Sequence, residues 1–297
     1  MKIVIIQEAG RHEKNKNFRE SLNLHRSLSK IEGVESKVWG LNYLEFTTPF
    51  SEIENWADVI FIIENYTSDW LPISEISESK KIKIFWSIDS HCVLQQHQYL
   101  CKILKIDILL NSTNGYLSKY DGLVKESHWF PNSYPDDLID KLNIEKTVDV
   151  GFCGNILNRG HVIDSLDKYE IKKDIFVIGD DMVNSINSYK IHVNCNISDD
   201  INYRTFETTG CGTFLLTNYT PGLELLFEIG SEIVIYNDLD DLDQKVRYYL
   251  DNENEREKIS RAGYERSKRD HTYFERSKFL VEIIKKYIKN EFLQSTK

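Results

Sequence analysis

One stretch of the chain combines an arginine and a glutamate at helical spacing with a glycine-rich exit into an apolar run. The stretch is YRTFETTGCGTFLL, residues 203–216, in which Arg204 stands three residues before Glu207. A carboxylate can accept hydrogen bonds from the two adjacent hydroxyls of a ribose, and an arginine on the same helical face can reach a phosphate. The pattern indicates a nucleotide site. The alternative is a plain ion pair between Arg204 and Glu207 on a surface helix.

A second candidate is a glycine-rich turn between a strand-like run and a helix expected to start near His161. It reads GFCGN over residues 151–155 and continues as Asn158, Arg159 and Gly160. Glycine lets the backbone approach a ligand, and the N-terminus of the following helix favours a phosphate. Arg159 is suited to pair with a diphosphate through two parallel hydrogen bonds. The alternative is a turn that only links a strand to a helix.

A third candidate follows the apolar run at residues 174–178. Gly179 comes directly after it, and a glycine there would let a flat base lie against the backbone. Asp180 is the next residue. The alternative is an ordinary turn in which an aspartate caps a helix.

An acidic cluster near the C-terminal end resembles a set of metal ligands at first sight. It contains Asp238, Asp240, Asp241 and Asp243. Acids are also favoured in the first turn of a helix, where they face the positive end of its dipole. We expect these residues to begin a helix, and we expect no protein-bound metal.

Alternating strand-like and helix-like runs position these candidates. Apolar, β-branched runs separated by helical patterns predict a parallel α/β sheet covered on both faces. The expected strands are 2–6, 36–39, 56–64, 82–88, 106–111, 148–153, 174–178, 190–194, 212–217 and 232–236. The expected helices are 17–31, 97–105, 242–250, 253–268 and 273–292. Ligands of such sheets bind beyond the carboxyl ends of the strands.

A segment with two prolines, residues 128–136, interrupts this alternation and predicts a domain boundary. We therefore expect two Rossmann-like domains that face each other across a cleft, at residues 1–140 and 141–272. The remaining segment, 273–297, is expected to form a helix that crosses back to the first domain.

The composition narrows the class of protein. The net charge of −10 over 297 residues argues against a nucleic-acid binder, although a local basic cleft would still permit one. The five cysteines form no CxxC pair and predict neither a disulfide framework nor a zinc site. The chain opens on a strand-like run without a leader pattern, and it has no apolar run near 18 residues. We expect a cytoplasmic protein without a membrane span.

The combination of these motifs resembles the C-terminal domain of glycosyltransferases with the two-domain GT-B fold. The matching pattern is Arg-x-Phe-Glu-x-x-x-Cys-Gly before an apolar strand, and the similarity extends over roughly residues 148–284. Its later parts are the segment 227–236 and the motif His271-Thr272-Tyr273. The domain is similar to glycosyltransferase family 1, and most similar to its CgeB-like bacterial and phage branch.

The resemblance implies roles for the candidate residues. Glu207 stands where these enzymes hold the donor ribose, and Gly154 and Asn155 stand at the loop near the diphosphate. Arg159 and Arg204 would offset the diphosphate charge. Asp199 occupies the position, eight residues before the ribose glutamate, that contacts the donor sugar in many relatives, where Glu is preferred. Backbone N–H groups of residues 202–205, which include Tyr203 and Thr205, would face the phosphates.

The N-terminal half would then bind the acceptor at its strand ends, residues 7–11, 64–66 and 87–91. Asp89 and His91 are the candidates for a general base, which must reach the acceptor hydroxyl. If the reaction retains the anomeric configuration, no such base is required. The alternative for Asp89 is that it caps the helix that follows it.

The resemblance implies a hexosyltransferase that moves a sugar from a nucleoside diphosphate sugar, with a UDP-sugar as the first expectation. It would need no cofactor beyond this co-substrate, and no metal. The acceptor could be a glycan, a protein or a modified nucleobase. The alternatives are a nucleotide-sugar epimerase and a non-catalytic nucleotide-sugar-binding scaffold. A basic rim of the N-terminal cleft would favour DNA as acceptor, and a neutral, aromatic rim would favour a glycan.

Overall fold

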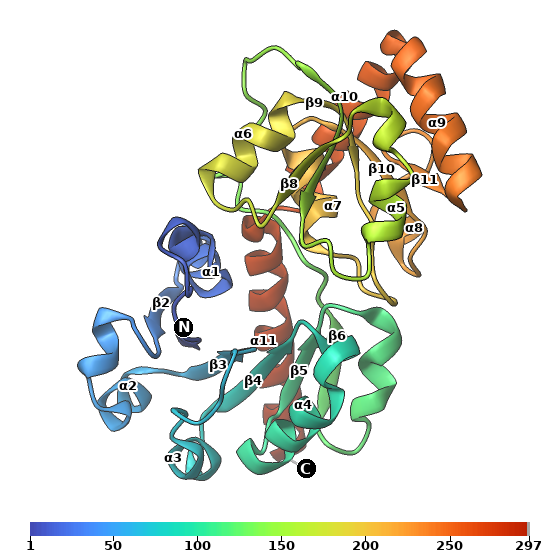
Figure 1. Ribbon diagram of the computed structural model, residues 1–297. Helices are drawn as coiled ribbons and strands as arrows, with labels where there is room; N and C mark the ends of the chain where they lie inside the picture. The colour runs from blue at the N-terminus through green and yellow to red at the C-terminus, as the bar shows by residue number, and fades with distance from the viewer. Residues whose placement is uncertain (296–297) are drawn as a thin grey trace.

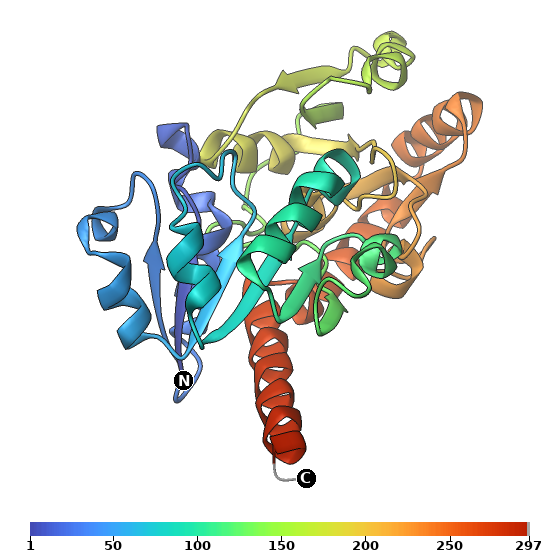
Figure 2. The same ribbon diagram turned by 90° about the horizontal axis from the view of Figure 1, so that it is seen from below.

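The computed structural model describes residues 1–295 and shows two α/β lobes (Figures 1 and 2). The first lobe is built around a six-stranded sheet and the second around a five-stranded sheet, and every strand pair in both sheets is parallel. Residues 296 and 297, the end of the expected segment 273–297, lie outside the described residues.

The N-terminal sheet has the order β2-β1-β3-β4-β5-β6. Its strands are short, and the four inner ones are apolar and buried at their centres, as expected for a parallel sheet that is covered on both faces. They are β1 (Lys2–Ile6), β2 (Glu35–Trp39), β3 (Val59–Ile63), β4 (Ile82–Ser87), β5 (Ile108–Asn111) and β6 (Glu126–Trp129).

Alternating side chains of these strands enter two separate cores. On one face, Ile5, Phe61 and Trp86 pack with α1 (Glu20–Leu28) and with α11 (Tyr273–Ser295). On the other face, Ile60 and Phe85 pack with α2 (Phe50–Trp56), α3 (Ile73–Glu78) and α4 (Ser90–Leu104). Three 3-10 turns complete the lobe: η1 (Glu13–Phe18) after β1, η2 (Leu44–Thr47) after β2 and η3 (Asn114–Tyr120) after β5.

The C-terminal sheet has the order β11-β10-β9-β7-β8. Its strands are β7 (Val148–Gly154), β8 (Lys172–Ile175), β9 (Tyr189–Val193), β10 (Phe214–Asn218) and β11 (Val234–Tyr236). One face packs against α5 (Gly160–Asp164), α9 (Leu239–Asp251) and α10 (Glu253–Asp270), and the other packs against α6 (Asp180–Ser188), α7 (Tyr203–Gly210) and α8 (Leu223–Leu226).

Several expected elements differ from the observed ones. The helix expected at 97–105 is α4, which already begins at Ser90. The segment 128–136 was expected to be only a boundary, but β6 occupies residues 126–129 and pairs with β5. The strand expected at 174–178 is displaced to 172–175, because Phe176 adopts a left-handed backbone with φ of 56° and ends the pairing. The helix expected at 17–31 begins only at Glu20, after η1.

Two crossings of the chain join the lobes, and they are bonded to each other. The first leaves β6 through residues 130–135, and the second leaves α10 through residues 271–273. Tyr134 forms a parallel bridge to Thr272, with hydrogen bonds from Tyr134 N to His271 O (3.2 Å) and from Tyr273 N to Tyr134 O (3.1 Å). From Tyr273 onward, α11 runs along the N-terminal sheet and contributes Leu280 and Ile284 to its core.

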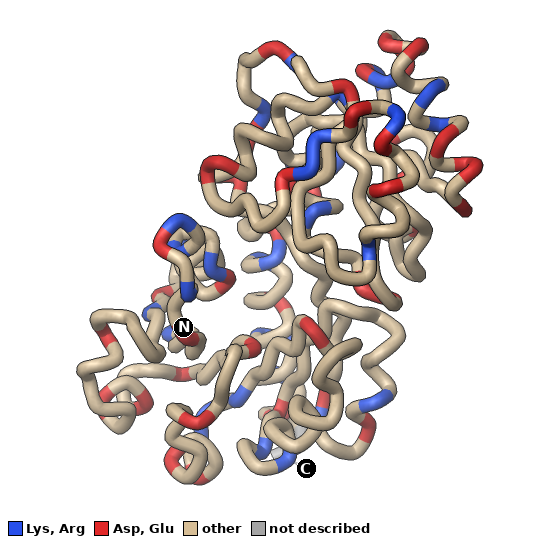
Figure 3. Tube along the Cα trace, in the orientation of Figure 1, with Lys and Arg blue, Asp and Glu red and all other residues tan. Residues whose placement is uncertain are grey.

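Charged residues of both signs are interspersed over both lobes. Figure 3 shows lysine and arginine next to aspartate and glutamate along most of the trace, without a long basic stripe. Within residues 1–295, no helix combines the length and the apolar character needed to cross a membrane.

Gly263 illustrates how tightly α10 is packed against the loop that precedes β11. A Cβ at this position would stand 2.3 Å from the backbone oxygen of Glu232, which cannot move alone. We expect Gly263→Ala to lower the free energy of unfolding by about 1–3 kcal/mol, as overpacked sites do. The measurement is urea unfolding. Gly115→Ala is the matched control, because nothing lies within 4 Å of its added Cβ. Equal stability of the two variants would contradict the packing described.

Candidate active site

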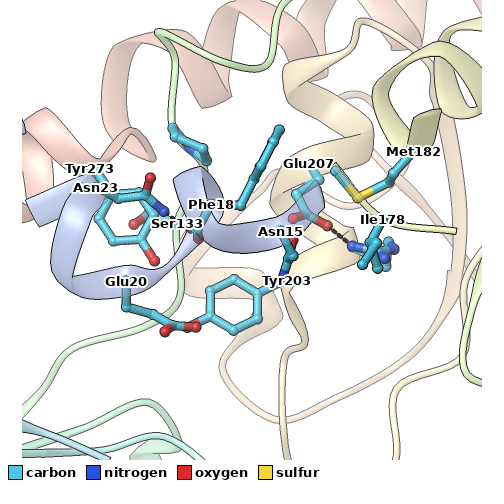
Figure 4. A pocket seen from close by; sticks show the side chains of 12 residues that line it. Asn15, Phe18, Glu20, Asn23, Ser133, Ile178, Met182, Tyr203, Glu207 and Tyr273 are labelled. Carbon is cyan, nitrogen blue, oxygen red and sulfur yellow. Dashed lines mark hydrogen bonds and ion pairs between the residues drawn. The ribbon is translucent and has the colours of Figure 1, made fainter. Parts of the chain in front are cut away.

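The carboxyl ends of the two parallel sheets contribute the loops that line the space between the lobes. A crevice of about 140 Å³ lies there, and Figure 4 shows side chains of both lobes around it. Asn15 and Phe18 come from η1, whereas Met182, Arg204 and Glu207 come from the C-terminal lobe. Both lobes also contribute charge, through Glu20 of α1 on one side and through Arg204 and Glu207 on the other.

Arg204 and Glu207 lie on α7 and face this crevice rather than bulk solvent. The guanidinium donates to a carboxylate oxygen of Glu207 through its terminal NH1 nitrogen, and its Nε donates to the backbone oxygen of Cys153 at 2.9 Å. The Glu207 residue is only 8% exposed. The ion pair between Arg204 and Glu207, which was the alternative to a nucleotide site, therefore exists. It is located at the interdomain crevice and not on an outer surface.

A fully buried histidine fixes the backbone behind this pair. His192 on β9 accepts a hydrogen bond from the Cys153 backbone N–H at 3.1 Å through Nε2, and its Nδ1 lies 2.5 Å from the Thr208 hydroxyl. Since Nε2 accepts, Nδ1 carries the proton and donates. Burial lowers the pKa of His192 to about 3, so the imidazole is neutral at neutral pH. The end of β7 is thereby linked to α7. No sequence motif singles out this residue.

The glycine turn after β7 places Arg159 across the ends of two strands. Its Nε donates to the Cys195 backbone oxygen at 2.6 Å, and its NH1 donates to the Asn155 backbone oxygen at 3.1 Å. α5 begins at Gly160, close to the expected start. Gly154 is half-buried and Asn155 is exposed. The loop therefore presents a partly exposed arginine at the carboxyl edge of the sheet.

Gly179 has a different neighbour from the one that sequence reasoning assigned. Its backbone is left-handed, with φ of 64°, and an added Cβ would stand 2.2 Å from the backbone oxygen of Lys14 in the N-terminal lobe. The bare face of Gly179 thus contacts η1 and is not open to a base. Asp180 is exposed at the start of α6, and its neighbour Asp181 pairs with the Lys14 ammonium at 2.7 Å. Ile178, one residue earlier, lines the crevice.

In the loop between β9 and α7, the aspartate expected to contact the donor sugar is exposed, and the next aspartate is buried. Asp199 is exposed, whereas Asp200 is 8% exposed and belongs to the space between the lobes. Burial, together with the Asp89 carboxylate from the other lobe, raises the pKa of Asp200 to about 7, against the opposing effect of Arg159. Asp200 is therefore a buried acidic group that sequence reasoning named only as part of the run 198–200.

Two of the backbone donors expected at residues 202–205 are already bonded within the protein. Asn202 N donates to the Asn196 side chain at 3.1 Å, and Thr205 N donates to the Asn202 backbone oxygen at 3.1 Å. Tyr203 lines the crevice and packs against the core that α11 shares with the N-terminal sheet. The first turn of α7 thus connects the lobes. The backbone N–H groups of Asn202 and Thr205 already have acceptors within the protein.

In the N-terminal lobe, Asp89 stands at the N-cap of α4 without capping it through its side chain. The carboxylate is open to solvent at the cleft, yet protein surrounds it on most sides, and this desolvation raises its pKa, against the opposing effect of His91. His91 is half-buried, and its Nδ1 has no hydrogen-bond partner among the described residues. The capping alternative therefore does not account for the Asp89 side chain.

Glu64 supports the turn that carries Asp89. One Glu64 oxygen, Oε2, accepts from the backbone N–H groups of Ile88 and Asp89, both at 2.7 Å. Burial first, and the Asp89 carboxylate second, raise the pKa of Glu64 to about 8. His97 Nε2 lies 3.6 Å from the same oxygen, but burial lowers the pKa of His97 to about 4, so this histidine brings no positive charge at neutral pH. Sequence reasoning placed Glu64 at a strand end without giving it a role.

The acidic cluster near the C-terminal end begins a helix, as expected. The Asp238 side chain accepts from Asp241 N at 2.8 Å and caps α9. In the part of the chain that the structure describes, no group of three or more histidine, cysteine, aspartate or glutamate side chains is arranged to hold a metal ion.

The role of His192 predicts a specific pH dependence of stability. Its pKa is about 3 in the folded state against 6.5 unfolded, so between these values the unfolded chain binds a proton that the folded chain does not. Its contribution is present above pH 6.5 and is lost as the pH falls towards 3. We expect His192→Gln to destabilise the protein by about 1–3 kcal/mol at pH 7 through lost hydrogen bonds.

The free energy of unfolding of this variant should fall less steeply than that of the wild type as the pH is lowered. The difference in slope should be about 1.4 kcal/mol per pH unit between pH 4.5 and 6. The measurement is the free energy of unfolding in urea at several pH values for both proteins. Comparison with the wild-type protein cancels the opposing contributions of Glu64 and Asp200. Parallel pH profiles would show that His192 is not buried in its neutral form.

Comparisons with known proteins agree with this arrangement. Residues 138–282 match the family model described as "Glycosyl transferase-like". No curated protein is similar enough in sequence to match. Among solved structures, sucrose-phosphate synthase from Thermosynechococcus elongatus superposes with a TM-score of 0.69 at 9% identity, over 97% of this chain and 99% of that one.

Two further solved structures extend the comparison. The Anabaena protein HepE in complex with UDP-glucose has a TM-score of 0.66 at 11% identity, over 96% of this chain and 100% of that one. The T4 phage β-glucosyltransferase has a TM-score of 0.67 at 16% identity, over 96% and 99%. The chain therefore has the two-domain GT-B fold, with both Rossmann-like lobes present, as expected.

Proposed function

We propose that this chain is a glycosyltransferase that moves a hexose from a UDP-sugar to an acceptor hydroxyl. The observation that carries the proposal is the placement of Arg204 and Glu207 at a crevice between the carboxyl edges of two facing sheets, inside the segment that matches the glycosyltransferase-like family model. The fold is shared with a UDP-glucose complex and with a glucosyltransferase, which supports a UDP-sugar as the donor.

On the donor side, Glu207 would accept hydrogen bonds from the two ribose hydroxyls. Arg204 already holds this carboxylate in place, so its orientation is set before the ligand arrives. Arg159 spans the ends of β7 and β9 and would offset the charge that develops on the diphosphate as it leaves. We expect this stabilisation to come from arginines and backbone dipoles and to require no bound metal.

On the acceptor side, Asp89 would act as the general base. Its carboxylate is not used as a cap, its pKa is raised, and Glu64 fixes its backbone. As the acceptor oxygen bonds to the anomeric carbon, its proton passes to Asp89, and the bond from that carbon to the diphosphate oxygen breaks. A single displacement of this kind inverts the anomeric configuration. The CgeB-like branch and a cytoplasmic location stay predictions.

The ribose role of Glu207 is testable by removing one hydroxyl from the ligand. The wild-type protein should bind UDP about 10- to 100-fold more tightly than 2′-deoxy-UDP, since a hydrogen bond to a charged group is worth about 1.5–3 kcal/mol. In Glu207→Gln, which keeps an oxygen for Arg204, this preference should largely disappear. The measurement is isothermal titration calorimetry in buffer containing EDTA.

Glu265→Gln serves as the matched control, because Glu265 is an exposed glutamate on α10. It should keep the wild-type preference for UDP. If Glu207→Gln discriminates the two nucleotides as the wild type does, then Glu207 does not hold the ribose. If binding appears only after a divalent metal is added, the expectation of a metal-free site is wrong.

The base role of Asp89 predicts both a rate and a pH profile. With water as the acceptor, Asp89→Asn should slow the hydrolysis of UDP-glucose by about 10²- to 10⁴-fold, while UDP affinity stays unchanged. In the wild type, activity should fall as the pH drops through the raised pKa of Asp89, above the ordinary aspartate value of 3.8, because the base must be ionised. Steady-state hydrolysis from pH 4 to 9 measures both effects.

The control is Asp121→Asn, at an exposed aspartate of the same lobe, which should leave the rate and the profile unchanged. A rate for Asp89→Asn within a few-fold of the wild type would exclude Asp89 as the base and would favour a mechanism that retains the anomeric configuration.

A further inference from the structure

We propose that a groove between the loop after β3 and helix α4 is the acceptor subsite, and that it takes a neutral glycan. This inference rests on the proposed function, because the occupant of the groove is identified as the acceptor. The groove has a volume of about 570 Å³ and is separate from the crevice that Arg204 and Glu207 line. That volume lies within the range of small-molecule sites, roughly 300–1,000 Å³.

The lining of the groove has the two-sided chemistry of a sugar-binding surface. Its apolar wall is formed by Ile73, Leu100 and Ile103, which are half-buried and anchored on the core beneath the sheet. Two tyrosines, Tyr66 and Tyr99, also line the groove, and 48% and 63% of their surface is exposed. A pyranose presents a C–H face that packs on an uncovered ring, such as that of Tyr99, and a perimeter of hydroxyls that needs polar partners.

Those polar partners are present and unengaged. The side chains of Thr67, Ser68, Asp69 and Gln96 line the groove. Within residues 1–295, none of the four makes a hydrogen bond or an ion pair through its side chain to another part of the described protein. Hydroxyl, amide and carboxylate groups that lie unpaired around an apolar wall suit a ligand with many hydroxyls, since such a ligand both donates and accepts.

The charge of the groove lining favours a neutral acceptor over a phosphate-rich one. No lysine or arginine is among its lining residues, and the Asp69 carboxylate is. The nearby cations, Arg11 and Arg19, lie over the Tyr66 ring at 4.0 and 4.5 Å from its centre. Arg19 is also paired with Glu20 at 3.0 Å. A nucleic acid needs cations along its backbone, whereas a neutral glycan does not.

A buried histidine links the wall of the groove to the turn that carries the candidate base. His97 forms part of its wall, and His97 Nε2 lies 3.6 Å from the Glu64 oxygen that accepts from the Asp89 backbone. His97 Nδ1 is fixed by the Ser87 hydroxyl at 2.7 Å. A glycan seated against Tyr99 would therefore lie beside the turn that carries Asp89, and we propose that its reacting hydroxyl reaches this carboxylate.

The test uses saturation-transfer NMR on the full chain with maltotriose, cellotriose and tri-N-acetylchitotriose as probes. A single-stranded oligonucleotide that contains hydroxymethylcytosine is the charged comparison. At least one trisaccharide should bind, and the oligonucleotide should not. Tyr99→Ala should weaken trisaccharide binding about two- to tenfold, as expected for the loss of a ring contact, while Tyr99→Phe restores it. Tyr99 is exposed, so its truncation should not disturb folding.

Tyr248→Ala is the matched control, because Tyr248 is a 48% exposed tyrosine on α9 of the other lobe. UDP affinity is measured on the same samples. Tyr99-dependent binding of a trisaccharide without any UDP binding would support the glycan groove and refute the proposed transferase. The groove assignment is overturned if the protein binds UDP and one of three results accompanies that binding. Tyr99→Ala leaves trisaccharide binding unchanged, no trisaccharide binds, or the oligonucleotide alone binds.

Discussion

The arrangement of the two lobes depends on one buried guanidinium at the point where the chain crosses between them. Arg276, in the first turns of α11, donates from Nε to the Pro131 backbone oxygen at 2.9 Å and from its terminal nitrogens to the backbone oxygens of Asn132 (3.4 Å) and Asp270 (3.3 Å). It therefore joins both crossings. Burial lowers its pKa to about 10, so the group stays charged at neutral pH and must keep these acceptors.

This clamp sets which edges of the sheets face each other. Because all strands are parallel, every loop that follows a strand emerges at the carboxyl edge of its sheet, and the two carboxyl edges contribute the loops that line one cleft. The two lobes contribute different groups to this cleft. The N-terminal lobe contributes the carboxylates of Glu64 and Asp89, while the C-terminal lobe contributes Arg159 and Arg204 together with the carboxylates of Asp200 and Glu207. In the proposed function, the acceptor base and the diphosphate-binding arginines stand on opposite lobes.

Much of the fold could be predicted from the sequence, because buried parallel strands are nearly continuous apolar runs. Failures came where the apolar character of a run and its burial disagree. Ile175 and Phe176 belong to such a run, yet they are 40% and 70% exposed and lie at or beyond the end of β8. Conversely, β6 contains Ser127 and His128, polar residues that did not suggest a strand, and it is held by pairing with β5.

The residues of the candidate site also fall into a group that the sequence predicts and a group that it does not. Arg204 and Glu207 were predictable because helical spacing alone places them side by side. Asp200, Glu64 and the true neighbour of Gly179 were not, because each depends on a contact between residues far apart in the chain. The burial of Asp200 beside Asp89 and the contact of Gly179 with Lys14 both arise only when the lobes meet. Local patterns carry no record of such contacts.

The proposed function requires that the cleft bind and cleave a UDP-sugar. The most direct measurement incubates the full chain with UDP-glucose, UDP-galactose, UDP-N-acetylglucosamine and GDP-mannose, follows thermal unfolding, and detects the released nucleoside diphosphate by chromatography. The account predicts that at least one UDP-sugar raises the unfolding temperature and is slowly hydrolysed to UDP, while GDP-mannose does neither. If no nucleotide sugar stabilises the protein at millimolar concentration, the cleft is not a donor site and the account is wrong.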